Sequence, residues 1–374
     1  RWTSDWRQII QDPSIDIVIE LIGGTTLARS VVAETLKAGK IPVTANKALL
    51  AKHGEELFAL ADRKGCPIFF EASVAGGIPL IKALREGLVG NRIRSIHGIV
   101  NGTCNYILSR MSDEGGDFSA VLAEAQKLGY AEADPALDVD GWDSAHKIAI
   151  LASLAHGFWV QPDQFHVEGI RDITAEDIAF ARELGYAVKL LGIVKEAPGG
   201  AVDVRVHPAL VPRGHVLAGI SGVFNAVSIR GDVVGDTLFY GRGAGQDPTS
   251  SAVIADLADA ALVLAGGVKR RMGFSSRGKG RLWSMDKVVT PYYLRLSVLD
   301  QPGVLARIAA ILGGCKISIA SVIQRDRRKE GRTVPLILLL HESQESSLQR
   351  ALRKIDRLAC VRAKTRLIRI ETFK

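Results

Sequence analysis

The chain has 374 residues, 47% of them hydrophobic and 24% charged. This length and composition predict two or three folded domains and exclude extensive disorder. The formal net charge of +8 is unevenly distributed, because residues 1–267 hold 24 Lys and Arg against 32 Asp and Glu, whereas residues 268–374 hold 24 against 8. The net charges are therefore −8 and +16. The excess of basic residues is confined to the last third, so it does not by itself indicate a nucleic-acid-binding protein.

Targeting and redox signals are few. The longest apolar stretches, such as Ile148–Leu154 and Val334–Leu340, are far shorter than the roughly 20 residues that cross a bilayer. The N-terminus has no signal-peptide pattern, so we expect a cytoplasmic protein that makes no membrane contact. The four cysteines lack disulfide-framework or zinc-site spacing; they are Cys66, Cys104, Cys315 and Cys360. The sequence starts at Arg1, with no methionine before Met111, which indicates a processed or N-terminally truncated chain.

The first 75 residues alternate short apolar runs with helical patterns. Residues 15–22 form a nearly continuous β-branched run that ends at Gly23-Gly24, which is typical of a buried parallel strand followed by a turn. The pattern then predicts a helix, a strand, a helix and a strand, over residues 27–38, 41–45, 48–64 and 67–70. This order predicts a doubly wound α/β sheet.

The rest of the chain follows two other patterns. Helices and short strands between residues 80 and 229 predict an α+β domain, and the Gly-, Lys-, Arg- and Ser-rich residues 267–290 predict a linker. The elements beyond it follow a β-α-β-β-α-β order, which predicts a separate ferredoxin-like domain. We expect these elements over residues 292–299, 304–313, 317–324, 334–341, 346–358 and 362–370.

Two glycine-bearing segments could bind an anion. Gly23-Gly24 and Thr44–Lys47 follow predicted parallel strands, and ligands bind open α/β sheets at this edge. Lys47 at a helix start opposes the helix dipole, so it is either a solvated side chain or one that binds a cofactor phosphate or polarises a carbonyl. Residues 240–251 are glycine-rich and precede an apolar helix over residues 252–264. They form either an anion-binding loop or a packed turn.

An acidic segment leads into an apolar helix. Five carboxylates lie within residues 132–143; their spacing lacks the ligand rhythm of an EF-hand loop, so a solvated loop is favoured over a calcium site. Asp143 and Lys147 are four residues apart and share one helix face. They form either an exposed ion pair worth a few tenths of a kcal/mol or a buried functional pair. The apolar residues 148–152 favour burial.

These segments together resemble a known family. Six of them, in order and spanning most of residues 1–266, closely resemble homoserine dehydrogenase. They are Glu20–Gly24, Val43–Lys47, Glu71–Pro79, Gly98–Leu108, Gly129–Pro135 and Tyr240–Thr249. Leu299–Leu305 matches the strand-to-helix turn of an ACT domain.

The resemblance implies reversible, NAD- or NADP-dependent reduction of L-aspartate 4-semialdehyde to L-homoserine, in threonine and methionine biosynthesis. By motif, Lys147 corresponds to the proton donor and Lys47 to a second lysine near the nicotinamide and the reacting oxygen. Glu132 and Asp143 correspond to the ligands of the substrate's amino group. Oxidation of homoserine needs a neutral Lys147, so we expect it to be faster at alkaline pH.

The resemblance also implies cofactor and metal contacts. Gly23, Lys47, Gly129 and Gly245 correspond to cofactor-binding positions. A sodium ion is expected at Glu71 and at the backbone carbonyls of Val74, Gly76 and Ile78.

The implied architecture has three domains. We expect an NAD(P)-binding Rossmann-like domain over residues 1–75 with about 246–266, and a catalytic and dimerisation domain over residues 76–245. An ACT domain is expected over residues 291–374. The family's first strand and its Gly-x-Gly-x-x-Gly turn are not in this sequence, so the Rossmann-like sheet is expected to be incomplete, to bind dinucleotide weakly, and to leave the choice between NAD and NADP open.

The ACT resemblance implies L-threonine as an effector and a homodimer or homotetramer. A non-catalytic amino-acid sensor is the alternative function. Nucleic-acid binding through the basic end is disfavoured, because Arg325–Lys329 fits a solvated hairpin loop without aromatic stacking partners.

Overall fold

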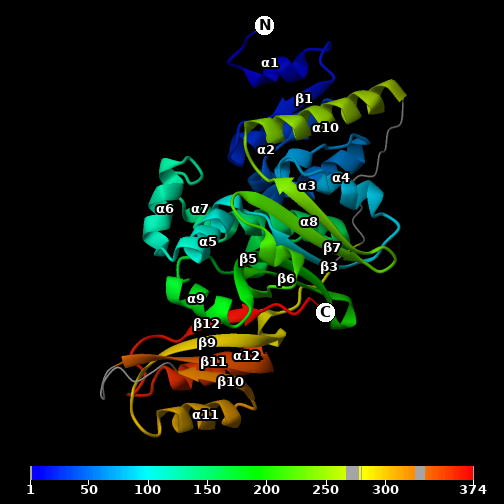
Figure 1. Cartoon of the computed structure of the whole chain (residues 1–374). Coiled ribbons are helices and arrows are strands. Elements are labelled where there is room, and N and C mark those ends of the chain that lie inside the picture. Colours follow the sequence, from blue (N-terminus) through cyan, green and yellow to red (C-terminus); the bar gives the residue numbers. More distant parts are fainter. Residues whose placement is uncertain (1, 267–277, 279, 325–332, 374) are drawn as a thin grey trace.

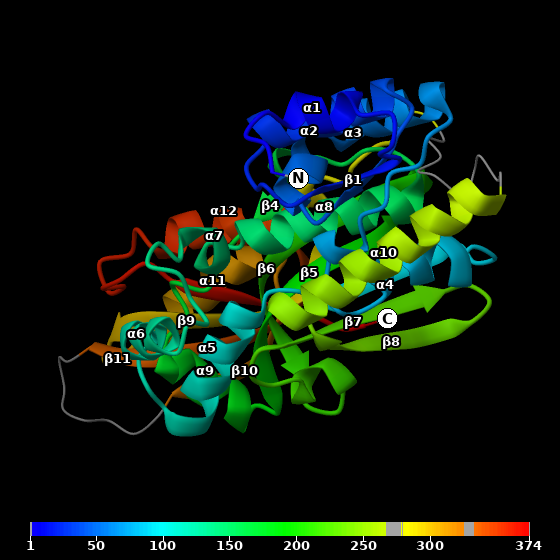
Figure 2. The same cartoon turned by 90° about the horizontal axis from the view of Figure 1, so that it is seen from above.

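The computed structural model describes residues 2–266, 278, 280–324 and 333–373. Residues 267–277 of the predicted linker and the basic segment Arg325–Lys329 lie outside this part of the chain. The N-terminal elements gather at one end of the molecule (Figure 1 and Figure 2). They are α1 (Trp6–Gln11), β1 (Ile17–Glu20), α2 (Thr26–Lys37), β2 (Ile41–Thr44) and α3 (Lys47–Lys64).

The N-terminal sheet is small. β1 and β2 are parallel neighbours, with Ile17 opposite Ile41. The strand predicted over residues 67–70 is wrong as a full strand, because a single parallel bridge between Val43 and Phe69 is all that forms there among the described residues. The later helix α10 (Gln246–Gly266) returns to pack on β2, so the two segments expected to share a domain do touch.

The middle of the chain forms a large, mainly antiparallel sheet with helices packed on it. Its strands are β3 (Ile93–Ile99), β4 (His166–Val167), β5 (Tyr186–Ala197), β6 (Ala201–Pro212), β7 (Phe224–Gly231) and β8 (Gly235–Arg242). Its helices are α4 (Leu80–Lys82), α5 (Gly102–Glu114), α6 (Phe118–Lys127), α7 (Ala136–Val139), α8 (Trp142–His156) and α9 (Ala175–Glu183). Short turns complete the region: η1 (Glu71–Ser73), η2 (Ala83–Gly87), η3 (Pro162–Gln164), η4 (Pro198–Gly200) and η5 (Val216–Gly219).

The apolar helix α8 is the centre of this region. It packs on β3, β5 and β6, and most of its residues are buried. Close approach requires a glycine in the sheet, because a Cβ on Gly192 would lie 2.1 Å from Cγ1 of Ile148. Asp143 and Lys147 therefore lie on a helix that packs directly against the sheet.

The C-terminal elements follow the predicted order. They are η6 (Met285–Lys287), β9 (Val289–Leu299), α11 (Val304–Gly314), β10 (Ile319–Gln324), β11 (Thr333–Gln344), α12 (Glu345–Ile355) and β12 (Arg366–Ile370). Their strands lie in the sheet order β10-β11-β9-β12, with α11 and α12 packed on each other. This arrangement matches the expected ferredoxin-like unit. Residues 280–290 are more ordered than a linker, since Leu282 bridges to Val202.

The C-terminal region has a hydrophobic core of its own, as expected of a domain, but its sheet is continuous with that of the middle region. β12 pairs in parallel with β6, placing Arg369 opposite Ala209 and Ile370 opposite Leu210. One ten-stranded sheet therefore runs through the middle and C-terminal regions, in the order β10-β11-β9-β12-β6-β5-β3-β7-β8 with β4 beside β6. The reason is that β6 has a free edge beyond β4, and β12 supplies its missing hydrogen-bond partners.

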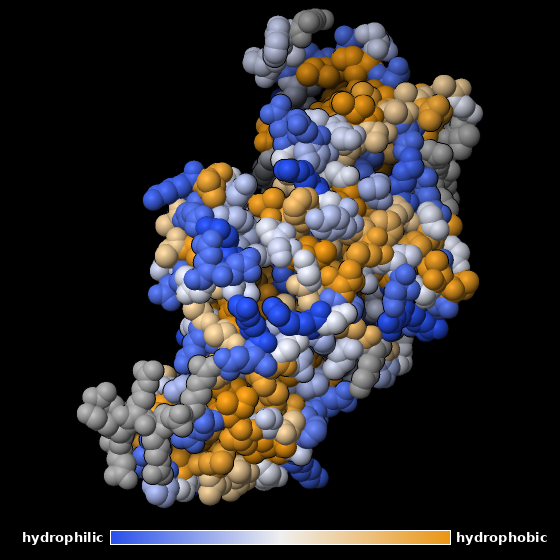
Figure 3. Space-filling model, in the orientation of Figure 1, coloured by the Kyte–Doolittle hydropathy of each residue, from blue (hydrophilic) through white to orange (hydrophobic). Residues whose placement is uncertain are grey.

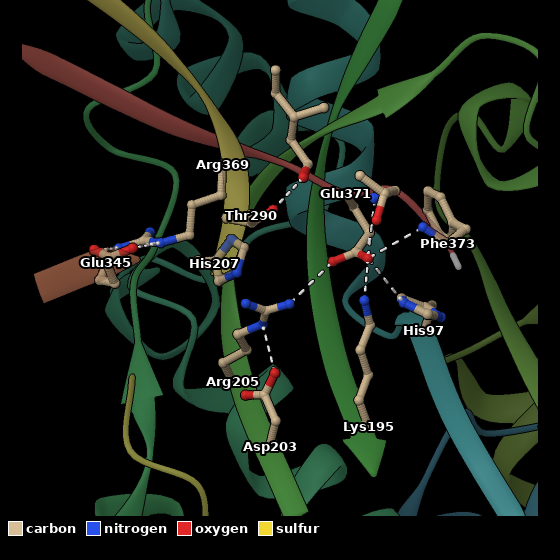
Figure 4. A network of polar contacts seen from close by, with 12 residues as sticks. His97, Lys195, Asp203, Arg205, His207, Thr290, Glu345, Arg369, Glu371 and Phe373 are labelled. Carbon is tan, nitrogen blue, oxygen red and sulfur yellow. Dashed lines mark hydrogen bonds and ion pairs between the residues drawn. The ribbon is translucent and has the colours of Figure 1, made fainter. Parts of the chain in front are cut away.

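A buried polar network secures this junction (Figure 4). The Glu371 carboxylate, 3% exposed, accepts hydrogen bonds from Lys195 and, at 3.2 Å, from Arg205. His97 Nε2 lies 3.5 Å from the same carboxylate. Two residues further on, the Phe373 ring stacks on His215 with 3.6 Å between centroids. The residues after β12 are thus anchored in the middle region.

α10 is the one helix within the described residues that is long and apolar enough to cross a membrane. Polar contacts hold one face of this helix against the rest of the chain. Asp256 accepts a hydrogen bond from the Glu71 amide at 2.7 Å, and Asp259 forms an ion pair with Lys82 at 2.7 Å.

Candidate active site

Lys47 is positioned by the carboxyl ends of β1 and β2. The buried Glu20 carboxylate accepts from the Thr44 hydroxyl at 2.6 Å. Asn46 caps α3 by accepting from the Leu49 amide at 3.0 Å, and its own amide donates to the Gly24 carbonyl at 2.7 Å. These bonds fix the start of α3, and Lys47 is its first residue.

Lys47, Asp143 and Lys147 form one charge cluster. The Lys147 ammonium lies 2.7 Å from Oδ2 of Asp143, and it also donates to the Val100 carbonyl at 2.7 Å. The Lys47 ammonium lies 2.5 Å from Oδ1 of Asp143. Asp143 is 2% exposed and Lys147 7%, whereas the Lys47 side chain is 35% exposed. The pair four residues apart is therefore buried, as the flanking apolar sequence indicated, and Lys47 connects it to solvent.

Asn101 completes the cluster, and no pattern in the sequence indicates this role directly. It caps α5 by accepting from the Cys104 amide at 2.7 Å. Its amide donates to Asp143 at 2.8 Å and to Asp138 at 2.7 Å. The turn Asn101-Gly102-Thr103 follows a strand, and this order predicts that Asn101 caps a helix. The two carboxylates that Asn101 contacts lie 37 and 42 residues further along the chain, so the turn does not predict them.

The cluster separates the two lysines electrostatically. Burial would raise the pKa of Asp143, but the two ammonium groups outweigh it and hold that pKa well below its usual range. Burial lowers the pKa of Lys147, and the nearby charge of Lys47 adds to this, against the attraction of Asp143. Burial would also lower the pKa of Lys47, but Asp143 outweighs it and the pKa is raised. Lys147 is thus the lysine that releases a proton more readily, which suits acid–base chemistry.

Glu132 and Gly129 make no hydrogen bond or ion pair with the cluster in the described part of the chain. The Glu132 side chain is exposed and makes no hydrogen bond or ion pair within the described chain, although its charge acts on Lys47. Gly129 follows α6 with a φ of 73°. Both belong to the loop between α6 and α7.

The two remaining glycine segments differ in their surroundings. A Cβ on Gly23 would meet no atom within 4 Å, so the backbone there borders open space. The segment before α10 is packed: the Gly77 amide donates to the Arg242 carbonyl at 3.2 Å, and a Cβ on Gly76 would lie 2.5 Å from the Gly243 carbonyl oxygen. Gly245 follows with a φ of 115°. For residues 241–243 the geometry therefore favours the packed turn.

The expected sodium residues lie in η1 and in the loop that joins it to α4. Both carboxylate oxygens of Glu71 are occupied, because they accept from the amides of Ile81 and Lys82 at 2.8 Å each. No cluster of three His, Cys, Asp or Glu side chains that could hold a metal occurs within the described residues. The Glu71 side chain is therefore engaged with backbone amides, and the other oxygen donors expected here are the backbone carbonyls of Val74, Gly76 and Ile78, of which that of Ile78 already accepts from the Leu80 amide at 2.7 Å.

Known proteins similar to this chain share one family name. Family models match as "Homoserine dehydrogenase" over residues 79–258, "Homoserine dehydrogenase, NAD binding domain" over residues 1–71 and "ACT domain" over residues 292–357. The homoserine dehydrogenase of Pseudomonas aeruginosa is 45% identical, over 99% of this chain and 86% of its own length. The chain belongs to the homoserine dehydrogenase family.

Further homoserine dehydrogenases agree. That of Neisseria gonorrhoeae is 43% identical over 100% of this chain and 86% of its own length. The crystal structure of a homoserine dehydrogenase from Thiobacillus denitrificans has a TM-score of 0.93 and 46% identity, over 99% of this chain and 85% of that one. A hyperthermophilic archaeal homoserine dehydrogenase, solved in complex with NADPH, has a TM-score of 0.60 and 29% identity, over 70% of this chain and 76% of that one.

Family membership settles the function class. This homoserine dehydrogenase is an NAD(P)-dependent oxidoreductase with an NAD-binding region, a catalytic region and an ACT domain. The predicted family, fold class and enzyme class are confirmed, and the alternative of a non-catalytic sensor is not favoured. The residue roles and domain limits stay predictions.

Proposed function

We propose that Lys147 is the general acid and base in the interconversion of L-aspartate 4-semialdehyde and L-homoserine. The observation that carries this proposal is the contact of both lysines with the buried Asp143 carboxylate. NADPH or NADH, when bound, supplies a hydride to the aldehyde carbon. Negative charge then grows on the carbonyl oxygen, and the Lys147 ammonium stabilises it and donates a proton. In homoserine oxidation the neutral amine of Lys147 accepts the hydroxyl proton.

Lys47 and Asp143 orient this step. The Asp143 carboxylate contacts the Lys47 ammonium through Oδ1 and the Lys147 ammonium through Oδ2. The Asn101 amide donates a hydrogen bond to Oδ2 and so holds the carboxylate in place. Because Lys47 is the more exposed lysine and starts a helix at the sheet edge, it is suited to face the reacting oxygen and the cofactor. The Glu132 side chain is exposed and pairs with no described residue, which suits binding of the substrate ammonium, with Asp143 as a second anionic neighbour.

The cofactor site is supported by the open sheet edge. Gly23 borders open space at the end of β1, next to the start of α3. Gly129, in the loop between α6 and α7, and Gly245, directly before α10, both adopt positive φ. We propose NADP as one nicotinamide cofactor, in line with the NADPH complex of the archaeal relative, and a cytoplasmic location, with which the four free thiols are compatible.

A Lys147→Ala variant tests the proposal. Homoserine-dependent reduction of NADP⁺ and of NAD⁺ is recorded by absorbance, with Lys64→Ala as the matched exposed control. We expect kcat to fall by about 100-fold or more, with KM for homoserine changed little, because the lysine acts on the reacting proton. A kcat near that of the control would remove Lys147 from the mechanism.

We also propose that a sodium ion binds at Glu71 and the loop that follows it, which contains Val74, Gly76 and Ile78. Oxygen donors suit a hard cation, and the loop offers its backbone carbonyls while the Glu71 carboxylate is engaged elsewhere. A stabilising effect of sodium chloride that equimolar choline chloride does not reproduce supports the site. Equal melting temperatures in the two salts argue against it.

The ACT domain supports amino-acid regulation, and we propose L-threonine as the effector and a homodimer or homotetramer as the assembly. β10 is an edge strand of the sheet, with Val322 41% exposed, and Figure 3 shows apolar residues gathered over the C-terminal region. Such an edge suits pairing with a second copy. Titrating L-threonine into the activity assay of the intact chain, and light scattering for the mass, test the two parts separately.

A further inference from the structure

A polar cavity lies outside the candidate active site. Its volume is about 240 Å³, and it lies between α5, α9, β5 and the segment that follows β6. Sites for drug-sized ligands span about 300–1,000 Å³. This cavity therefore fits a ligand with few non-hydrogen atoms.

The cavity holds a buried cation without a counter-ion. Lys189 is 4% exposed, and its ammonium donates to Oδ1 of Asn105 at 3.2 Å and to the Ile220 carbonyl. An ammonium has three donors, and the third finds no partner in the described part of the chain. No carboxylate there lies within ion-pair distance of it either. Burial lowers the pKa of Lys189 to about 8, partly opposed by the charge of Asp113, and an uncompensated buried charge is costly.

The lining of the cavity carries both signs of charge. Asp113 near the end of α5 and Arg213 after β6 line it and are exposed, and neither forms an ion pair with a described residue. The last turns of α5 also line it, and a helix C-terminus carries partial negative charge. This end favours a cationic group and disfavours a dianion such as phosphate. The hydroxyl-bearing Ser112 and Ser221 supply further polar lining.

We propose that this cavity binds a small α-amino acid. Its carboxylate pairs with the Lys189 ammonium, and its own ammonium faces Asp113 and the C-terminal end of α5. Such a zwitterion neutralises the buried cation and leaves no charge unmatched at the helix end. A simple carboxylate provides only the first of these contacts.

The cavity is distinct from the charge cluster, yet α5 connects them. Asn101 caps the N-terminal end of α5 and holds Asp143. Asn105, one turn later, accepts from Lys189. A ligand in the cavity therefore contacts α5, the helix whose capping residue Asn101 positions the Asp143 carboxylate. Through α5 and Asp143, a regulatory ligand can influence the proposed catalytic lysine.

Equilibrium dialysis with radiolabelled glycine and L-alanine on the full chain tests this site, with acetate as the carboxylate-only probe. Lys189→Met removes the cation with little change in volume, and Lys64→Met is the matched exposed control. Asp143→Ala impairs the proposed substrate site, so binding that survives in it belongs elsewhere. We expect glycine binding to weaken at least tenfold in Lys189→Met and to persist in Lys64→Met and Asp143→Ala.

Asp113→Asn provides a second, exposed variant that does not depend on the folding of Lys189→Met. We expect it to weaken glycine binding severalfold and to leave acetate binding unchanged. The proposal is overturned if folded Lys189→Met keeps its glycine affinity, if binding is lost in Asp143→Ala alone, or if no amino acid binds at about 10 mM. It is also overturned if Asp113→Asn leaves the preference for glycine over acetate unaltered. None of these results depends on the role of Lys147.

Discussion

The junction between β6 and β12 predicts a large local effect of Glu371→Gln. The substitution removes a carboxylate that is 3% exposed and contacts Lys195 and Arg205. Removing one partner of a buried ion pair costs about 3–5 kcal/mol. The lower end applies here, because the Lys195 side chain is 22% exposed and can reach water, and Arg205 keeps Asp203 at 3.6 Å.

Hydrogen exchange measures this loss where it occurs. The Glu371 amide donates to the Leu210 carbonyl at 3.0 Å, so the amides of residues 366–373 report on opening of the junction. A loss of about 3 kcal/mol corresponds to roughly 100-fold faster exchange there. Glu34→Gln is the control, since Glu34 pairs with Lys37 on the surface with both side chains about half exposed, and such pairs contribute at most about 1 kcal/mol. If Glu371→Gln speeds exchange no more than the control does, the network does not hold the junction.

Three further predictions concern the active site and its support. Asn101→Ala removes a donor from the buried Asp143 carboxylate, so kcat/KM should fall by about 10–100-fold; an unchanged value would contradict its positioning role. Homoserine oxidation should accelerate with rising pH, since Lys147 must be neutral to accept a proton and burial lowers its pKa below the usual 10.5. Asp143→Asn should move this rise to lower pH, because the carboxylate that raises the pKa of Lys147 is gone, and a flat pH profile would refute the assignment. Gly192→Ala should lower the melting temperature, since the added Cβ meets Ile148 at 2.1 Å and overpacking costs about 1–3 kcal/mol; a melting temperature equal to the parent's would show that α8 can shift.

The sequence predicts three members of the charge cluster, Lys47, Asp143 and Lys147, because each is placed by a short segment of sequence around it. The four-residue spacing and the apolar residues 148–152 place Asp143 and Lys147 on one buried helix face. A strand followed by Thr44–Lys47 places Lys47 at the ligand-binding edge of the sheet. Asn101 escapes such reasoning, because a helix cap is a local feature whereas its carboxylate partners come from another segment.

The strands are predicted less well than the helices. β5 and β6 each run for 12 residues, longer than the apolar runs that predict them, because their mutual pairing extends the ladder beyond the apolar core. β8 is missed since its residues are mostly exposed and its glycines suggest a loop. The pairing of β12 with β6 joins residues about 160 positions apart, and no local pattern encodes such a partner.

The shared sheet limits how this enzyme can be re-engineered. In a protein whose domains are joined only by a linker, a regulatory domain can be exchanged by cutting the chain at that linker. Here β12, which follows the residues that match the ACT domain, closes the edge of the catalytic-region strand β6. Excision of the C-terminal region together with β12 would therefore leave β6 with unpaired amides and carbonyls and Arg205 without Glu371. An open edge of this kind invites intermolecular strand pairing and aggregation. Exchange of the ACT domain between relatives therefore has to include β12, Glu371 and the matching residues of β6, so that two separate segments of the chain are replaced together.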